Sequence, residues 1–286
     1  MEVALIKPQG FCSGVTRAVQ LVEKAKEEHP DKNIYILGML AHNQVLIDDL
    51  TKKGFITLLG DEKEEIKNLN KGDVLVFTAH GHSSELDELA KEKGLITYDA
   101  TCFKVLDNLK KIKREIEDGH QVIYIGQSGH KEANAALSVS NNVSLYDTKL
   151  LINYQLITDK SPFVLNQTTL NFYELNKYHQ DILRHYPNAR IENEICNATR
   201  LRQEAILKID KDVDLIVIVG HSKSSNSNKL FDIAKSNFQN ALVVMVNNLD
   251  ELKAINLNGK RKAAVGSGAS TPQYIVDEIY NYLISL

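Results

Sequence analysis

Three cysteines stand at equivalent points of a pattern that this 286-residue sequence repeats. Cys12, Cys102 and Cys196 are separated by 90 and 94 residues, and each ends an extended stretch and opens a helical pattern. A short apolar run that closes on a glycine follows 24 to 26 residues later, as IYILG, VIYIG and LIVIVG. Short apolar runs of this kind predict buried strands. Self-similarity at a nearly constant spacing therefore predicts one module in three copies.

The alternation of β-branched runs with helical patterns predicts an α/β fold with mostly parallel sheets. We expect three pseudo-symmetric α/β modules around a central site, with boundaries at residues 1–100, 101–195 and 196–286. The third module lacks the strand that ends the first two. Residues 3–8 are therefore predicted to complete the sheet of the third module and close the ring.

Composition excludes several classes of protein. A hydrophobic fraction of 43% and a charged fraction of 25% are ordinary for a soluble globular chain. The formal net charge of −3 argues against nucleic acid or an anionic membrane as a partner. No apolar run approaches the roughly 20 residues of a membrane span, and the N-terminus resembles no signal peptide. Three cysteines without a secretory signal predict a cytoplasmic protein without a disulfide framework.

Polar side chains follow the other predicted strands of each module. Ligands of parallel α/β sheets gather where strands end and helices begin, so these positions are candidates for a binding site. The second and third junctions of the three modules carry His42 and His80, His130 and Thr168, and Ser224 and Ser270. An approximate threefold axis would bring the cysteine thiols to the centre and place these side chains around them.

Two kinds of metal site fit three converging thiols. A lone cysteine in such a chain is typically a small buried hydrophobe, but three at one repeat position, with no others in the sequence, favour a shared metal site. Zinc would need a fourth ligand such as His130, and the sequence has no CxxC or HxxxH pair. A [4Fe–4S] cluster with three cysteines would leave one iron open. The residues alone favour neither. The SSNSN segment is equally compatible with helix capping and with anion binding.

Nine motifs together resemble one family over residues 10 to 270: GFCSGVTRA, AHNQV, TAHG, DATC, GHKE, QTT, CNATRLRQEA, SSNSN and GSGAS, in that order. The family is that of the 4-hydroxy-3-methylbut-2-enyl diphosphate reductases, or IspH/LytB proteins. The resemblance implies an iron–sulfur oxidoreductase of the non-mevalonate (MEP/DOXP) isoprenoid pathway. The last step of that pathway removes the hydroxyl of (E)-4-hydroxy-3-methylbut-2-enyl diphosphate reductively, giving isopentenyl and dimethylallyl diphosphates. It also implies one [4Fe–4S] cluster with an open iron, held by Cys12, Cys102 and Cys196.

The resemblance further implies roles for polar residues. Glu132 would be the proton source, and Thr168 would lie beside it near the substrate hydroxyl. The diphosphate would be bound by His42, His80, His130, Ser224, Ser225, Asn226 and Ser270. The sequence has no GxGxxG motif between a strand and a helix, so the implied electron donor is a separate protein such as a ferredoxin or flavodoxin.

Two other functions use the same residues. A non-redox [4Fe–4S] hydro-lyase would remove a hydroxyl without consuming electrons, and a non-catalytic phosphometabolite-binding protein would hold structural zinc. The sequence also departs locally from the family pattern, at Phe103 and Lys104 after Cys102, at Lys131, and in the segments containing His82 and His221. None of these departures removes a matched ligand or pocket residue.

Overall fold

The computed structural model describes residues 1–150 and 157–286, which divide into two compact units. The first unit comprises residues 1–16, 41–53 and 197–286, and the second comprises residues 17–40 and 54–196. Among the described residues there are three four-stranded sheets, and every strand pairing in them is parallel. The predicted α/β fold is thus confirmed.

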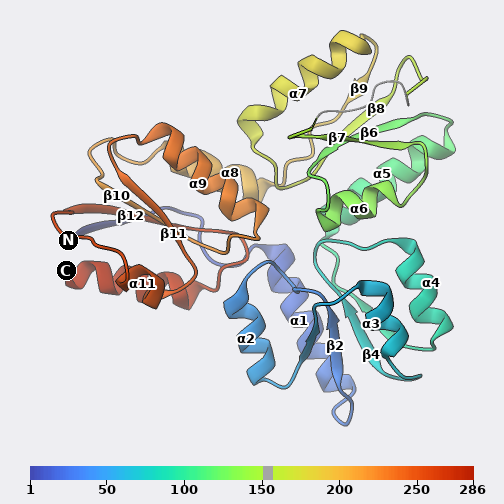
Figure 1. The fold of residues 1–286 in the computed structure, drawn as a ribbon, viewed down its shortest axis with the longest axis horizontal. Coiled ribbons are helices and arrows are strands. Elements are labelled where there is room, and N and C mark those ends of the chain that lie inside the picture. The colour runs from blue at the N-terminus through green and yellow to red at the C-terminus, as the bar shows by residue number, and fades with distance from the viewer. Residues whose placement is uncertain (151–156) are drawn as a thin grey trace. The chain divides into compact units, whose positions relative to one another are not determined.

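The sheet of the first unit has the strand order β1-β12-β10-β11 (Figure 1). Its strands are β1 (Glu2–Leu5), β10 (Leu215–Val219), β11 (Leu242–Val246) and β12 (Lys262–Ser267). The helices of this unit are α2 (Gln44–Lys52), α8 (Asn197–Leu207), α9 (Ser225–Asn237), α10 (Leu249–Lys253) and α11 (Gln273–Ser285). The N-terminal strand β1 pairs with β12, Glu2 opposite Lys262 and Leu5 opposite Val265.

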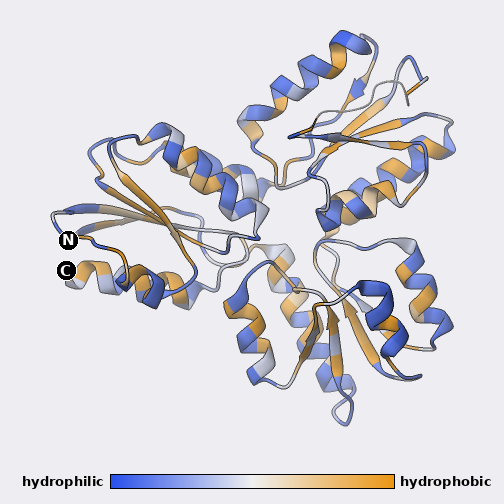
Figure 2. Ribbon diagram, viewed as in Figure 1, coloured by the Kyte–Doolittle hydropathy of each residue, from blue (hydrophilic) through white to orange (hydrophobic). Residues whose placement is uncertain are grey.

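Apolar side chains of the first unit fill both faces of its sheet. Val217 of β10 packs with α10 and α11, whereas its neighbour Ile218 packs with α8 and α9 on the other face. Successive side chains of a strand point to opposite faces, so a strand covered on both sides must be apolar throughout. The LIVIV run of β10 meets this requirement, and Figure 2 shows the same hydrophobic character along the strands.

The second unit holds two sheets, with the strand orders β3-β2-β4-β5 and β7-β6-β8-β9. Their strands are β2 (Ile34–Leu37), β3 (Ile56–Leu58), β4 (Val74–Phe77), β5 (Ile96–Asp99), β6 (Val122–Gly126), β7 (Val143–Asp147), β8 (Phe163–Asn166) and β9 (Arg190–Ile191). The helices of this unit are α3 (Glu62–Asn68), α4 (Ser84–Glu92), α5 (Phe103–Glu117), α6 (Lys131–Leu137) and α7 (Phe172–His185). Helix α1 (Ser13–Glu28) crosses the division between the units at Thr16.

The three sheets share one topology. In each, the strand after the cysteine-led helix lies second from one edge, and the strand that leads to a cysteine lies at the other edge. β1, β5 and β9 occupy that second edge, and β1 reaches it from the far end of the chain. The predicted division into modules 1–100, 101–195 and 196–286 assigns one sheet to each module, and these boundaries stay a prediction.

Two glycines of the first unit leave space for the start of helix α9. A Cβ on Gly220 or Gly268 would lie within 2.3 Å of the hydroxyl oxygen of Ser227. Glycine is therefore required at both strand ends for the helix to approach so closely. None of the helices in the described part of the chain combines the length and apolar character that a membrane crossing requires.

Candidate active site

The three cysteines occupy equivalent positions in their sheets. Each immediately precedes a helix, namely α1, α5 or α8, and each donates its backbone N–H to a carbonyl two residues beyond the end of a neighbouring strand. These bonds are Cys12 to Ala269 at 3.0 Å, Cys102 to Ala79 at 3.0 Å, and Cys196 to Thr168 at 3.1 Å. The sequence repeat thus produces a repeated backbone geometry around each thiol.

The cysteine side chains have the chemistry that an iron–sulfur cluster requires. All three are half-buried and none forms a disulfide within the described residues. A thiolate is the usual cluster ligand, and a helix N-terminus favours negative charge. Among residues 1–150 and 157–286, no three His, Cys, Asp or Glu side chains are close enough together to hold a single metal ion. Cys12 belongs to the first unit and the other two to the second, so their joint role stays a prediction.

Glu132 and Thr168, which the sequence predicts as the catalytic pair, lie together in the second unit. Glu132 is the second residue of helix α6 and is 3% exposed. The backbone N–H of Thr168 donates to Glu132 Oε1 at 2.8 Å, and its hydroxyl lies 3.1 Å from Oε2. Thr168 follows β8, so the end of one strand and the start of the neighbouring helix position the pair. The carbonyl of Thr168 also accepts from Cys196, which ties the carboxyl to a predicted ligand.

Burial changes the acidity of Glu132. It raises the pKa of this carboxyl from its ordinary value of 4.5 to about 7, because a charged carboxylate is poorly solvated in the interior. The hydrogen bonds from Thr168 and from the phenol of Tyr124 oppose that rise. A carboxyl with a pKa near 7 can be protonated and can release its proton at neutral pH. This is the property that the predicted proton source needs.

His130 caps the helix that carries Glu132. Its Nδ1 accepts the backbone N–H of Glu132 at 3.2 Å. Because Nδ1 acts as an acceptor, the ring proton of neutral His130 is on Nε2, and a second proton would break the cap. The ring of His80 lies edge-on to that of His130, with 6.0 Å between centroids. The structure therefore brings these two predicted diphosphate ligands together.

The remaining predicted diphosphate ligands lie in the first unit. The hydroxyl of Ser270 donates to the carbonyl of His42 at 3.1 Å. Ser224 caps α9, and Ser225 and Asn226 form the first turn of that helix. Asn226 is 5% exposed, and neither polar atom of its side chain has a hydrogen-bond partner within the described residues. A buried amide in this state is costly unless a ligand binds it, so Asn226 suits a polar substrate.

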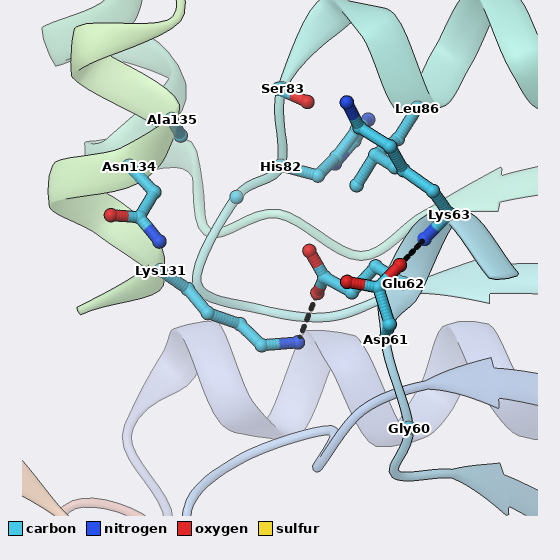
Figure 3. A pocket seen from close by; sticks show the side chains of 11 residues that line it. Gly60, Asp61, Glu62, Lys63, His82, Ser83, Leu86, Lys131, Asn134 and Ala135 are labelled. Carbon is cyan, nitrogen blue, oxygen red and sulfur yellow. Dashed lines mark hydrogen bonds and ion pairs between the residues drawn. The ribbon is translucent and has the colours of Figure 1, made fainter. Parts of the chain in front are cut away.

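Lys131 connects the start of α6 to the first sheet of the second unit. Its ammonium donates to the carbonyl of Leu37 at 3.1 Å and to Glu62 at 2.6 Å. A Cβ at Gly38 would lie 2.2 Å from that ammonium, so glycine makes room for it. Figure 3 shows Lys131 reaching Glu62 beside a pocket of about 340 Å³ that lies entirely within the second unit. Lys131, a predicted departure from the family pattern, thus forms an ion pair with Glu62.

The departures at Phe103 and Lys104 have different structural outcomes. Phe103 is exposed at the start of α5. Lys104 forms an ion pair with the buried Glu194, which Lys111 also contacts. Glu194 comes two residues before Cys196 and Lys104 two residues after Cys102. The ion pair therefore links the segments of two predicted ligands, and sequence reasoning had not identified it.

The departure at His221 places a half-buried imidazole in the turn before α9. Its Nδ1 accepts the backbone N–H of Lys223 at 3.0 Å. Burial, with a smaller effect from the nearby Lys223, lowers the pKa of His221. The neutral ring therefore stabilises the turn that leads to Ser224.

Comparison with known proteins identifies the family. A family model described as LytB protein matches residues 3–284. The chain belongs to the LytB protein family. This match confirms the family resemblance that the nine motifs indicate. It also extends the resemblance to nearly every residue of the LytB chain.

Several relatives of this LytB protein carry one name. It is 37% identical over 287 residues to the 4-hydroxy-3-methylbut-2-enyl diphosphate reductase of Macrococcus caseolyticus, covering 99% of this chain and 89% of that protein. It is 34% identical over 295 residues to the protein of the same name from Malacoplasma penetrans, covering 99% and 97%.

A solved structure shares the fold. The E-1-hydroxy-2-methyl-but-2-enyl-4-diphosphate reductase from Plasmodium falciparum is similar with a TM-score of 0.87 and 29% identity, covering 99% of this chain and 87% of that one. This LytB protein thus shares its fold with that solved structure.

Proposed function

We propose that this LytB protein is an oxidoreductase that converts (E)-4-hydroxy-3-methylbut-2-enyl diphosphate to isopentenyl and dimethylallyl diphosphates. The reaction takes two electrons and two protons and releases water. The observation that carries the proposal is the buried Glu132 carboxyl, with a pKa of about 7, held against Thr168. Similarity to proteins named as this reductase supports the same assignment.

The proposed cofactor is one [4Fe–4S] cluster held by Cys12, Cys102 and Cys196. Their equivalent backbone positions, and the absence of a disulfide between them within the described residues, support this ligand set. When bound, a cluster with one open iron supplies single electrons and polarises the substrate hydroxyl. The proposal requires the thiol of Cys12 to meet the other two in the working enzyme. It also includes a cytoplasmic location and a separate electron donor such as a ferredoxin or flavodoxin.

Glu132 and Thr168 deliver the proton to the substrate hydroxyl. Hydroxide is a poor leaving group, so the hydroxyl needs a proton as its carbon–oxygen bond breaks. With a pKa of about 7, the carboxyl of Glu132 can carry that proton at neutral pH, and the hydroxyl of Thr168 lies within hydrogen-bond distance of the carboxyl. Thr168 can accept the Glu132 proton while donating its own toward the substrate oxygen. A hydroxyl is suited to this role because it donates and accepts at once.

The proposed diphosphate ligands are His42, His80, His130, Ser224, Ser225, Asn226 and Ser270. The buried amide of Asn226 can donate hydrogen bonds to phosphate oxygens. It lies in the first turn of the 13-residue helix α9, where backbone N–H groups and the helix dipole also favour an anion. The set contains no arginine or lysine, so positive charge would have to come from a histidine.

Substrate affinity should therefore depend on pH. We expect at least one of the histidines His42, His80 and His130 to carry the proton that pairs with the diphosphate. Affinity should fall roughly tenfold as pH rises from 6 to 9, because a protonated imidazole is lost over that interval. Calorimetric titration with the substrate, with its phosphate ionisation corrected by the buffer, measures this. A constant affinity over the interval would contradict the proposal of a charged histidine.

Purification without oxygen tests the proposed function. We expect brown protein with about four irons and matching acid-labile sulfide per chain, and product formation only with a reductant. Product formation without reductant would indicate the hydro-lyase. One zinc per chain with no colour and no turnover would indicate the phosphometabolite-binding protein.

A further inference from the structure

Tyr124 contacts the proposed proton source from inside the protein core. It is the third residue of β6, and its hydroxyl donates to Glu132 Oε1 at 3.0 Å. The ring is 1% exposed and packs among apolar side chains of β6, β8, α5 and α6. A Cβ on Gly126 would lie 3.2 Å from the ring edge, so the glycine leaves space for it on the same strand face. None of the nine family motifs includes this residue.

The surroundings of Tyr124 exclude a role in carrying protons. Burial, with a further effect from Glu132, raises the pKa of this phenol well above its ordinary value of 10. The hydroxyl therefore stays protonated at neutral pH and donates to Glu132. Its apolar surroundings offer no route by which a proton could reach water. What remains for Tyr124 is to hold the carboxyl.

The two oxygens of Glu132 are not equivalent. Within the described residues, Oε1 accepts from both the Tyr124 hydroxyl and the Thr168 backbone N–H, whereas Oε2 contacts only the Thr168 hydroxyl. A proton on Oε1 would have to displace one of its donors. The proton of the neutral carboxyl is therefore on Oε2, where it faces the hydroxyl of Thr168. Without the Tyr124 hydroxyl, this preference would weaken.

We propose that Tyr124 is a positioning residue that fixes the Glu132 carboxyl and directs its proton to Oε2, toward Thr168. The inference rests on the proposed function of Glu132 as the proton source. This role of Tyr124 can be measured through the pKa of the Glu132 carboxyl. A donor to a carboxylate stabilises the charged form, so Tyr124 holds the pKa of Glu132 below the value that burial alone would give.

Other titratable groups near Glu132 do not account for this effect. On its own helix, Lys131 is paired with Glu62, and the cap residue His130 accepts from the backbone. Across from it, the His80 ring meets the ring of His130. Asp147, at the end of β7, accepts from the backbone N–H groups of residues 128, 149 and 150. Tyr124 and Thr168 are the groups whose hydrogen bonds reach the carboxyl within the described residues.

The test removes one hydroxyl and follows the carboxyl directly. Infrared difference spectra of full-length protein, purified without oxygen, give the midpoint at which the Glu132 carbonyl band titrates, assigned by its loss in Glu132→Gln. Tyr124→Phe should raise that midpoint from about 7 by roughly one pH unit. The upper-pH limb of the kcat profile should move by the same interval. The matched control is Tyr146→Phe, because Tyr146 is equally buried and donates to Asp181, at 2.9 Å, and not to Glu132.

An unchanged midpoint in Tyr124→Phe, or an equal change in the Tyr146→Phe control, would overturn the proposal. If Tyr124→Phe does not fold, infrared spectra of the wild type test the proposal instead. The C–O band of one buried tyrosine should shift with the Glu132 midpoint, and it should not do so in Glu132→Gln. A raised midpoint in Tyr124→Phe without reductive turnover in any variant would support the role of Tyr124 on the carboxyl. That result would count against the proposed function alone.

Discussion

Cys102→Ser is expected to abolish cluster assembly. A serine hydroxyl does not replace a thiolate as an iron ligand at neutral pH, and a site with three protein ligands retains too few when one is lost. The backbone N–H of residue 102 would still donate to Ala79, and serine is a favourable residue at a helix N-terminus. The variant should therefore fold like the metal-free wild type and be colourless. Iron and sulfide analysis with a visible spectrum measures this.

A neighbouring substitution provides the control for Cys102→Ser. Phe103→Ser changes an exposed side chain in the same turn and leaves all three thiols in place, so it should retain iron and colour. Iron content at the wild-type level in Cys102→Ser would remove Cys102 from the ligand set. Serine at Cys12 or Cys196 should have the same effect, since the three thiols occupy equivalent backbone positions.

The repeat and the parallel sheets could be predicted from the sequence because both depend on local patterns. A run such as LIVIV, apolar at every residue, is suited only to a strand covered on both faces. The third module lacks a fourth strand of its own, which predicts residues 3–8 as the missing strand. The strand that pairs with β12 covers Glu2–Leu5, opposite Lys262–Val265, so it begins and ends earlier than predicted. The contact between Glu132 and Thr168 is implied by the family resemblance and not by the repeat, which places Thr168 alone at a strand end.

The side-chain partners could not be predicted, because they depend on which helices cover which face. Lys131 pairs with Glu62 across 69 residues, and Lys104 pairs with Glu194 across 90. Tyr124 had a weak signal in the sequence, as the one phenol within the aliphatic run VIYIG. A buried hydroxyl needs a partner, which predicts a polar neighbour without naming it. The identity of that neighbour, Glu132, required the packing of α6 against β6.

Glu132→Gln should reduce turnover by at least about 10²-fold while leaving the iron content unchanged. The amide preserves the shape of the side chain and can accept from Tyr124 and Thr168 at the same oxygen, but it has no acidic proton to give. Steady-state kinetics with a defined reductant, on protein of measured iron content, gives the comparison. Glu174→Gln, an exposed carboxylate in the first turn of α7, is the control and should keep wild-type turnover. Near-wild-type turnover in Glu132→Gln would remove the carboxyl from the mechanism.

The same substitution should alter stability in a pH-dependent way. Between about pH 4.5 and 7 the unfolded chain has released the Glu132 proton and the folded chain has kept it, so the free energy of unfolding of the wild type falls as pH rises. Glutamine does not titrate, so the variant lacks this loss. Its stability relative to the wild type should therefore increase by about 3 kcal/mol from pH 4.5 to pH 8, at 1.36 kcal/mol per unit of pKa difference.

Urea unfolding of the metal-free wild type and Glu132→Gln at a series of pH values measures this difference. An enzyme that holds a carboxyl in its interior for proton transfer gives up stability at neutral pH to do so. Loss of turnover together with a gain in stability above pH 7 is therefore the combination that a buried acid predicts and a structural glutamate does not. If the stability difference stayed constant with pH, the carboxyl would titrate alike in the folded and unfolded chain, and burial would not have tuned it for catalysis.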